Sequence, residues 1–527
     1  MRRLIPANTG VWLQRRWQST PRRARQQQPT AVTALAENAV SDISAKWQKL
    51  AATPFLNEAT EPLDVSRIPK LAHGLDKVLF RPGPHFMVDP LTGRSQFNKW
   101  IKDICQPEEF NYDAQPEYKI ASDDVVSQQL ALQHGLKYTS STSSITAALA
   151  KTYLLVAQGK QVNRRHFSPA LVTQPTRFTN GTRQPVSVIL RYRNGVYAVD
   201  SDKDPDEKWN ILQILGKSME KALTATPEEF DMYRKGNEHQ LTPENMDKDY
   251  HRYAKIENFL LRAQIDCYHP KLPNKTFDLK TRGTLPIRMA PDEYLDNVDY
   301  KITGKDGVLQ SFEREDYDML RSAMLKYSFQ VRIGGMDGVF VAYHSTAEIF
   351  GFQYLPLKTM DRWLFKNSVT GDQAFAVSVK LLQAAFDAVT KEFPEQDVRV
   401  TLAQEDGLEH RQPLTVWAEP IPESPVDAQP AAATPLTLHT IHTASIHNGR
   451  LVTGALHLLA DGTDDWAVEY RVSKSGKSPT ELRDAYLSVR DQMENNGPAA
   501  GQHLRFLDEI RQACGLREHK KAVMASL

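Results

Sequence analysis

Apolar residues along the chain follow two different spacings, which together predict a mixed α/β (α+β) fold. Helical spacing, with an apolar residue at every third or fourth position, predicts helices over 209–223, 313–333 and 372–393. A hairpin is predicted at 186–200, where two alternating strands flank the turn formed by Asn194 and Gly195. Four further strands are predicted at 338–343, 349–354, 398–402 and 414–418.

A run of hydroxyl residues at 138–144 precedes the apolar stretch 145–156. Hydroxyl side chains accept hydrogen bonds from the free N–H groups of a first helical turn, so this run predicts an N-cap and a helix start. Hydroxyl groups at a helix N-terminus would also suit a phosphate group, and this second interpretation stays open.

The most informative stretch is a second predicted hairpin, with strands at 259–266 and 276–281. Side chains of a strand alternate between its two faces, so Asp278 and Lys280 project from the same face while Leu279 points into a core. If the two strands pair, Asp266 at the end of the first strand reaches that same surface. The sequence therefore predicts two carboxylates and an ammonium group converging at one end of the hairpin.

This combination of side chains can hold a divalent cation and activate a water molecule. We expect Asp266 and Asp278 to coordinate Mg²⁺ or Mn²⁺, with the carbonyl oxygen of Leu279 as a further ligand and Lys280 orienting a metal-bound water. Oxygen ligands suit a hard cation, and there is no nearby thiolate or histidine set that would favour zinc. A buried Asp278–Lys280 pair that only balances charge is the alternative. A similar Asp-x-Lys pattern at 205–208 lies in a wholly polar segment, which favours a solvated loop.

Charge is distributed unevenly. Residues 1–36 contain seven arginines and no acidic residue, which is typical of a mitochondrial transit peptide, with a basic nucleic-acid-binding arm as the alternative. Removing this segment leaves 58 basic against 64 acidic residues, a net charge of about −6. We therefore expect any polyanion to bind in a local basic groove or through metal ions. No apolar run reaches the length of about 18 residues that a spanning helix needs, and peripheral membrane contact stays open.

We expect five segments along the chain: the transit peptide at 1–36, an N-terminal arm and lead-in at 37–135, the core at 136–418, a Pro/Ala-rich linker at 419–436, and a C-terminal strand and helix extension at 437–527. The linker has five prolines in eighteen residues. In the extension, strands are predicted at 451–460 and 466–472 and helices at 478–493 and 502–514.

A strand ending in Asp, followed by an (Asp/Glu)-x-Lys strand and preceded by a helix with a glutamate, resembles the PD-(D/E)XK nuclease superfamily, and its RecB-like exonucleases in particular. The resemblance implies a mixed sheet flanked by helices and makes Glu220 a third carboxylate at the metal. A solvated surface glutamate is the alternative for Glu220. Members of the superfamily also place Gln and Tyr on the next helix near the metal. Tyr327 and Gln330 could fill that place, although Tyr327 is equally expected in a core.

Several blocks of sequence also resemble a fungal mitochondrial family that processes RNA 5′ ends and degrades RNA. The blocks that carry the resemblance are 140–146, 262–268, 277–282, 326–334 and 337–344. The resemblance implies 5′→3′ exoribonuclease action or its activation, single-stranded RNA as substrate, and association with the mitochondrial RNA polymerase. It implies a location in the matrix, with association to the inner membrane as an open alternative. On this basis RNA contact is assigned to Arg262, Gln264, Arg282, Tyr327 and Gln330.

Two other functions compatible with the same residues are carried forward. The first is a catalytically silent RNA-binding scaffold with a nuclease fold, which would couple the mitochondrial RNA polymerase to RNA processing. The second is a mitochondrial DNA nuclease, because nothing in the candidate residues distinguishes RNA from DNA.

Overall fold

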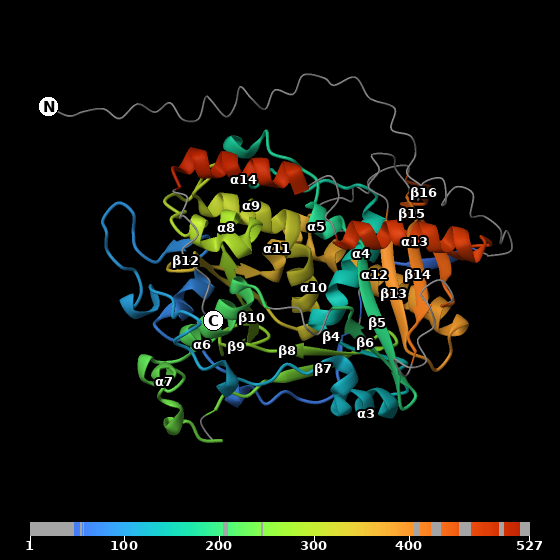
Figure 1. The fold of residues 1–527 in the computed structure, drawn as a ribbon, viewed down its shortest axis with the longest axis horizontal. Helices are drawn as coiled ribbons and strands as arrows, with labels where there is room; N and C mark the ends of the chain where they lie inside the picture. The colour runs from blue at the N-terminus through green and yellow to red at the C-terminus, as the bar shows by residue number, and fades with distance from the viewer. Residues whose placement is uncertain are drawn as a thin grey trace.

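The computed structural model describes residues 47–52, 55, 57–203, 209–243, 246–404, 412–422, 434–452, 465–494 and 500–516. The predicted transit peptide and the polar Asp-x-Lys segment at 205–208 lie outside these residues. Two sheets, one of twelve strands and one of five, are present in the described part of the chain. Helices cover both sheets, so the mixed α/β prediction is confirmed (Figure 1).

The larger sheet is built mostly from antiparallel neighbours, with parallel pairs where β4 meets β6 and β8. Its central path runs, in order, through β1 (Gln48–Ala51), β17 (Trp466–Lys474), β15 (Thr437–His447), β14 (Leu414–Pro420), β13 (Val398–Gln404), β5 (Val186–Arg193), β6 (Val196–Ser201), β4 (Tyr138–Ser141), β8 (Phe259–Gln264), β7 (His251–Ile256) and β2 (Glu58–Ala59). β16 (Arg450–Leu451) pairs with β15. Strands from both sides of the predicted linker therefore lie in one sheet.

Helices pack on both faces of the larger sheet. α4 (Thr142–Ala157) and α12 (Ser368–Glu392) cover one face and pack against each other. α3 (Val125–Gln133) and α13 (Pro479–Glu494) cover the other face at opposite ends of the sheet. α4 begins where the sequence predicts it, because the Ser141 hydroxyl accepts a hydrogen bond from the Ser144 N–H.

The smaller sheet has the strand order β3 (His85–Phe86), β12 (Ile349–Pro356), β11 (Gly338–His344), β10 (Thr276–Gly283) and β9 (Cys267–Tyr268). One face packs on α6 (Ile211–Thr224) and on the 3-10 helix η2 (Leu75–Phe80). The other face packs on α9 (Phe312–Ser322) and α10 (Met324–Gly334). α10 also contacts β8 and α4, so it lies between the two sheets.

The remaining helices of the described chain are short or peripheral. The α-helices are α5 (Asn180–Arg183), α7 (Pro227–Asp231), α8 (Leu285–Met289), α11 (Leu357–Leu364) and α14 (Ala500–Cys514). The 3-10 helices are η1 (Val65–Arg67), η3 (Lys99–Ile101), η4 (Tyr112–Ala114), η5 (Ala121–Asp123), η6 (Pro169–Leu171), η7 (Glu238–Gln240) and η8 (Pro291–Asn297). Among the described helices, none combines the length and the apolar character needed to cross a membrane.

The predicted single helix over 313–333 is wrong, because the structure has two helices there, α9 and α10. The carbonyl groups of Arg321 and Ser322 accept hydrogen bonds from the 179–182 segment, which draws them out of the helical pattern. The Ser322 hydroxyl also donates to the Asp318 carbonyl at 2.6 Å, a bond that bends helices. Apolar spacing continues across the break, so the sequence pattern did not reveal it.

The predicted hairpin over 259–281 is also wrong in its pairing. β8 lies in the larger sheet between β4 and β7, whereas β10 lies in the smaller sheet beside β11. Only the two residues of β9, which follow Asp266, pair with the start of β10. The chain therefore leaves one sheet and enters the other at Asp266. Three longer strands, β4, β7 and β15, were missed altogether, as were the short strands β1, β2, β3 and β9.

Candidate functional site

The candidate site lies along the open edge of β10. β9 pairs with Thr276 and Phe277 only, and beyond them no strand occupies this edge of β10 in the described chain. The N–H of Leu279 instead donates to Asp266 Oδ2 at 2.9 Å. The N–H and C=O of one residue in an extended strand point to the same side, so the Leu279 carbonyl faces this edge as well.

Asp278 and Lys280 project from the face of β10 that packs on α9 and α10, as the strand period of two predicts. Lys280 Nζ lies 2.9 Å from Asp278 Oδ1 and 2.7 Å from Oδ2. The same ammonium lies 5.8 Å from the centre of the Tyr327 ring on α10, within reach of a cation–π contact. The arrangement brings two candidate site residues of the strand together with one from the next helix.

α6 brings Glu220 to this edge of the sheet. The helix starts at a capping box formed by Asn210 and Gln213, and its apolar side chains pack on the opposite face of β10, where Leu279 points. Glycines allow a close approach: a Cβ on Gly216 would lie 3.3 Å from Thr281 Oγ1, and one on Gly283 would lie 2.6 Å from Leu212 Cδ2. The close packing of α6 on β10 fixes the position of Glu220.

The carboxylates of the site influence one another. Burial raises the pKa of Asp266 well above its ordinary value, and the neighbouring Asp278 carboxylate raises it further. Burial also raises the pKa of Glu220, to about 7, with Lys280 opposing the rise and Asp278 adding to it. Burial alone would lower the pKa of Lys280, but Asp278 and Asp266 outweigh it, so this pKa is raised. Glu220 is half-buried, and its pKa responds to both Lys280 and Asp278, so three carboxylates and one ammonium influence one another.

An excess of negative charge in a confined space suits a divalent cation. Lys280 Nζ donates its hydrogen bond to Asp278 Oδ1, and no other described group donates to Oδ2. That oxygen, the carboxylates of Asp266 and Glu220, and the Leu279 carbonyl could serve as ligands for a hard cation. Within the described chain, however, no three or more His, Cys, Asp and Glu side chains are grouped closely enough to hold a metal ion. Holding a metal would therefore require small side-chain movements, including movement of Lys280 away from Asp278.

A pocket of about 200 Å³ opens onto this edge. Its walls include Glu220, Asp266 and Leu279 from the candidate site, together with Gln264. Other side chains come from distant segments or from the exposed face of α6: Tyr118, Tyr250, Lys217, Lys221 and Lys248. Lys221 is paired with Asp247 at 2.7 Å, and Lys217 lies 4.3 Å from the centre of the Trp209 ring. The lining of the pocket is therefore of mixed charge, because Asp247 and Asp249 also contribute to its wall beside the lysines and tyrosines.

The predicted RNA-contact residues separate into two groups. Gln264 is exposed and lines the pocket, while Tyr327 lies beside Lys280 and Gln330 follows it by three residues on α10. Arg262 is instead buried, with Nη1 2.6 Å from Asp124 Oδ2 and Nη2 bonded to the Lys119 carbonyl. This environment fits a role for Arg262 in holding β8 to the segment before α3.

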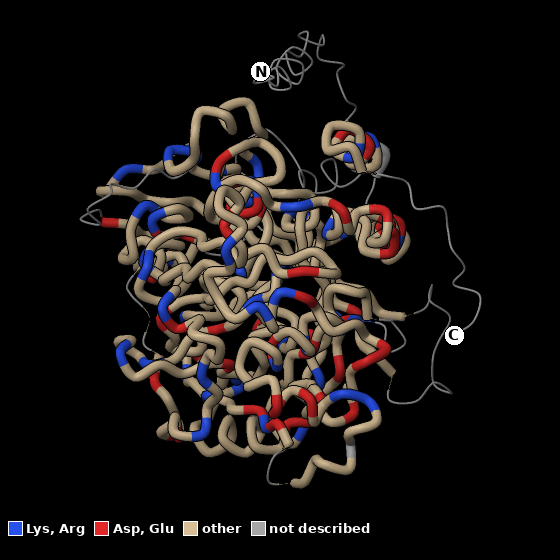
Figure 2. The backbone as a smooth tube through the Cα atoms, turned by 90° about the vertical axis from the view of Figure 1, so that its left-hand side faces the viewer, with Lys and Arg blue, Asp and Glu red and all other residues tan. Residues whose placement is uncertain are grey.

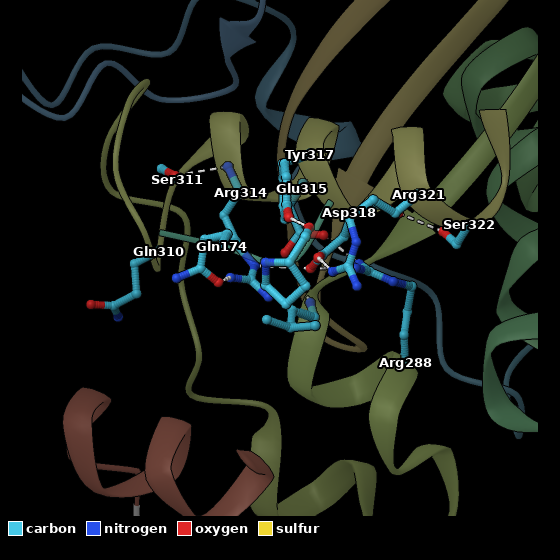
Figure 3. Close-up of polar contacts among 12 residues, drawn as sticks. Gln174, Arg288, Gln310, Ser311, Arg314, Glu315, Tyr317, Asp318, Arg321 and Ser322 are labelled. Atoms are coloured by element: carbon cyan, nitrogen blue, oxygen red, sulfur yellow. Dashed lines mark hydrogen bonds and ion pairs between the residues drawn. The ribbon is translucent and has the colours of Figure 1, made fainter. Parts of the chain in front are cut away.

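Arg282 is likewise buried, on the face of β10 that carries Asp278 and Lys280, but directed toward α9. Its Nε lies 3.7 Å from Glu315 Oε2, and burial together with the nearby Arg288 lowers its pKa. Figure 3 shows Arg288 and Arg314 converging on the carboxylates of α9, where Arg314 Nε lies 3.0 Å from Asp318 Oδ2. Glu315 also accepts a hydrogen bond from the Leu285 N–H at 2.9 Å. This network fastens α9 to the end of β10.

Sequence reasoning missed Tyr118 and Tyr250, because they reach the pocket from segments that are far from β10 along the chain. No local pattern marks either residue. A signal did exist for Lys217, since it precedes Glu220 by three residues and shares its side of α6.

The family model and the two proteins that match this chain all carry the name Pet127. The family model described as "Pet127: Mitochondrial protein Pet127" matches residues 118–387. A Schizosaccharomyces pombe protein named "mRNA degradation protein pet127, mitochondrial" is 30% identical over 482 residues, covering 88% of this chain and 91% of that protein. A Saccharomyces cerevisiae protein named "Putative mitochondrial translation system component PET127" is 33% identical over 314 residues, covering 56% of this chain and 37% of that protein.

Comparison with solved structures finds crystal structures of Scheffersomyces stipitis Rai1. One, in complex with (3'-NADP)+ and calcium ion, has a TM-score of 0.29 and 12% identity, covering 68% of this chain and 88% of that chain. Another has a TM-score of 0.30 and 11% identity, covering 67% of this chain and 90% of that chain. TM-scores this low establish neither a shared fold nor a shared activity.

Proposed function

The chain belongs to the Pet127 family of mitochondrial proteins, and from this membership and the geometry along β10 we propose that it acts in mitochondrial RNA degradation and processing as a metal-dependent 5′→3′ exoribonuclease. The observation that carries the proposal is the cluster of Asp266, Asp278, Glu220 and Lys280 at an edge of β10 that, beyond its short pairing with β9, no strand of the described residues covers. A purely structural cluster would not need three carboxylates around one ammonium, because burying excess charge is costly.

In this proposal each residue has a defined role. Asp266, Asp278 and Glu220, with the Leu279 carbonyl, would hold Mg²⁺ or Mn²⁺, which supplies an acidic water and polarises the scissile phosphate. Lys280, once released from Asp278, would orient the attacking water and offset charge on the phosphate. The pocket beside Asp266 would receive the end of the strand. A small pocket favours a chain end over the middle of a strand, which supports exonucleolytic action.

The choice of RNA as substrate rests on the name of the S. pombe relative, an mRNA degradation protein. Tyr118 and Tyr250 supply aromatic surfaces in the pocket on which a base could stack. Gln264 is the polar side chain nearest in sequence to Asp266 that remains exposed in the same wall. These three side chains are the candidates for holding the terminal nucleotide.

Hydrolysis can be measured with the purified full chain, Mg²⁺ and a 5′-monophosphorylated RNA labelled in its 5′-terminal nucleotide. Mononucleotide release is expected from the wild-type protein, and Asp278→Asn and Lys280→Ala are each expected to lose it. Glu228→Gln, an exposed glutamate on α7, serves as the control and should cleave normally. Equal cleavage by Asp278→Asn would exclude the cluster from the reaction. A DNA of the same sequence separates RNA from DNA cleavage.

A non-catalytic scaffold remains the second candidate, and one observation favours it. Asp278 and Lys280 neutralise each other directly, and the described carboxylates are not spaced as a preformed metal site. In that case the protein would bind RNA or the mitochondrial RNA polymerase without turnover at any Mg²⁺ concentration. Pull-down of the polymerase by a protein that never cleaves RNA would favour this function.

A further inference from the structure

Trp209 lies directly before α6 with about half of its surface in solvent. It is 48% exposed, and Lys217 Nζ lies over its ring at 4.3 Å from the ring centre. An ammonium group at this distance makes a cation–π contact and covers one face of the indole. The exposed fraction leaves the other face of the ring open to a ligand.

Lys217 connects this ring to the pocket beside the carboxylate cluster, because its side chain also forms part of the pocket wall. Lys221 in the same wall is neutralised by Asp247 at 2.7 Å. For Lys217, in contrast, no carboxylate of the described chain lies within ion-pair distance. Burial lowers the pKa of Lys217, and the carboxylates of Glu220 and Asp249 oppose this effect. Lys217 therefore offers an ammonium group that no ion pair holds, at the join between the pocket and the ring.

One side of α6 leads from the carboxylate cluster to this ring. Glu220, Lys217 and Gln213 follow one another at spacings of three and four residues, which places them in a row along the helix. Gln213 is exposed, and Trp209 precedes it by four residues. At a rise of 1.5 Å per residue, Glu220 lies about 13 Å along the axis from the start of α6. A strand that has its end in the pocket and follows this row would pass Lys217 before it reaches the ring.

The charge of the protein gives an aromatic contact particular weight. Basic and acidic residues are interspersed along the chain, without a face of one sign in the view of Figure 2, and the full sequence has 65 basic and 64 acidic residues. A general electrostatic attraction to RNA is therefore weak, and stacking of bases on aromatic side chains is the other main source of affinity for single strands. Two described tryptophans are exposed: Trp47 lies before β1 at the end of the larger sheet, whereas Trp209 lies beside the pocket.

We propose that the RNA strand whose end enters the pocket stacks one of its following bases on the open face of Trp209, while Lys217 contacts a phosphate between that base and the strand end. This inference rests on the proposed function for the identity of the ligand. Every base has an aromatic face, so the contact tolerates any sequence. Trp209 and Lys217 are thus positioning residues, which hold the strand in register with the carboxylate cluster and take no part in bond cleavage.

The test measures RNA binding separately from cleavage. A fluorescent single-stranded RNA of about 20 nucleotides, longer than the usual site sizes of single-strand binding folds, is titrated with the full chain in EDTA over a range of KCl concentrations. Trp209→Ala removes the proposed stacking surface, and Trp209→Phe keeps an aromatic ring there. Trp47→Ala is the matched control, because Trp47 is 47% exposed and Arg471 lies 5.4 Å from the centre of its ring.

Trp209→Ala is expected to weaken RNA binding about tenfold, which lies within the range for the loss of one stacked base. Trp209→Phe should retain most of the affinity, and Trp47→Ala should bind as the wild type does. Lys217→Gln is expected to weaken binding about threefold and to reduce the steepness of the log–log salt dependence by about 0.7, the value for one phosphate contact on a single strand. Lys391→Gln, at an exposed lysine at the end of α12, should show neither change.

RNAs that each lack a single base identify the stacked nucleotide. The abasic site is moved in turn through the first few nucleotides that follow the strand end. At the position that reaches Trp209, the affinity of the wild type should fall to that of Trp209→Ala on the intact RNA, and Trp209→Ala should lose nothing further. A tryptophan that only supports the start of α6 would show no such position.

Wild-type RNA affinity in Trp209→Ala would overturn the inference, and so would the absence of any abasic position at which the two proteins bind alike. A loss of binding of a single nucleoside 5′-monophosphate in Trp209→Ala would also overturn it, because the substitution would then act on the pocket itself. Failure of the proposed function looks different: RNA would bind through Trp209 in EDTA, and the wild-type protein would still release no nucleotide when Mg²⁺ is added.

Discussion

Glu220→Gln tests whether the carboxylate cluster is built for a metal at the expense of stability. Burial raises the pKa of Glu220 from 4.5 to about 7. The folded protein therefore keeps a proton on Glu220 between these pH values, while the unfolded chain releases it. The free energy of unfolding must then fall as pH rises through this range, and the full penalty applies above pH 7. A shift of this size corresponds to about 3 kcal/mol.

Glutamine cannot ionise, so the variant escapes this penalty. At pH 8 without metal, urea unfolding should show Glu220→Gln to be more stable than the wild type by up to about 3 kcal/mol. At pH 5 the difference should shrink to less than about 1 kcal/mol, because Glu220 is then protonated in the folded state and the pH lies only slightly above its pKa of 4.5 in the unfolded chain. Glu228→Gln, which makes the same change at an exposed position on α7, should show neither effect.

Metal binding should reverse the order. A hard cation must displace the proton held on Glu220, so its affinity should rise between pH 6 and pH 8, with proton release. Mg²⁺ at a hundred times its Kd would stabilise the wild type by about 2.7 kcal/mol, whereas Glu220→Gln should gain much less. The reasoning would be refuted if Glu220→Gln were less stable than the wild type at pH 8 in EDTA, since Glu220 would then be a stabilising partner of Lys280.

Three further predictions concern the surroundings of the site. Gly283→Ala places a Cβ 2.6 Å from Leu212 Cδ2 and should lower the free energy of unfolding in urea by about 1–3 kcal/mol. RNA cleavage should be lost even at temperatures where the variant is fully folded, and unchanged cleavage would show that α6 need not pack so closely. Asp124→Ala leaves the buried Arg262 without its carboxylate and should lower the free energy of unfolding by about 3–5 kcal/mol. A change in RNA affinity with little loss of stability would instead support RNA contact by Arg262. Lys151→Met should raise the free energy of unfolding most below pH 7, by up to about 5 kcal/mol, because burial lowers the pKa of Lys151 from 10.5 to about 7. This increase should fade as the pH approaches 10.5, and an increase that did not vary with pH would contradict the lowered pKa of Lys151.

The strand period alone was enough to place Asp278 and Lys280 on one face of β10, and helical spacing correctly located α6 and α12. The hairpin pairing could not be obtained in the same way, because partners are chosen by contacts between distant segments. One signal was available: Phe259 to Ala263 are buried on both faces of β8, and strands buried on both faces lie in the interior of a sheet. A strand with a neighbour on each side has no free edge for β10.

The sequence did not reveal that Arg262 and Arg282 are buried beside carboxylates. Arg262 and Arg282 lie within the blocks that carry the family resemblance, so their position in the sequence suggested contact with substrate. In the structure, each is buried next to a carboxylate from a distant segment, Asp124 for Arg262 and Glu315 for Arg282. A sequence pattern gives the side on which a residue lies, but not the partner that reaches it. That is why the carboxylate cluster could be foreseen from residue types, while the scaffold around it could not.

The difference between the predicted hairpin and the observed strand pairing explains why this edge of β10 is open to side chains. If β8 had paired with β10 as a hairpin, a carbonyl of β8 would accept the N–H of Leu279, and the edge would be filled by main chain. Because the chain turns from one sheet into the other at Asp266, this N–H is left for the Asp266 carboxylate, and the Leu279 carbonyl on the same edge is not used by a neighbouring strand. α6 can then bring Glu220 to the gap. The departure from regular pairing thus leaves oxygen atoms of Asp266, Glu220 and Leu279 near an open strand edge, where the proposed cation would bind.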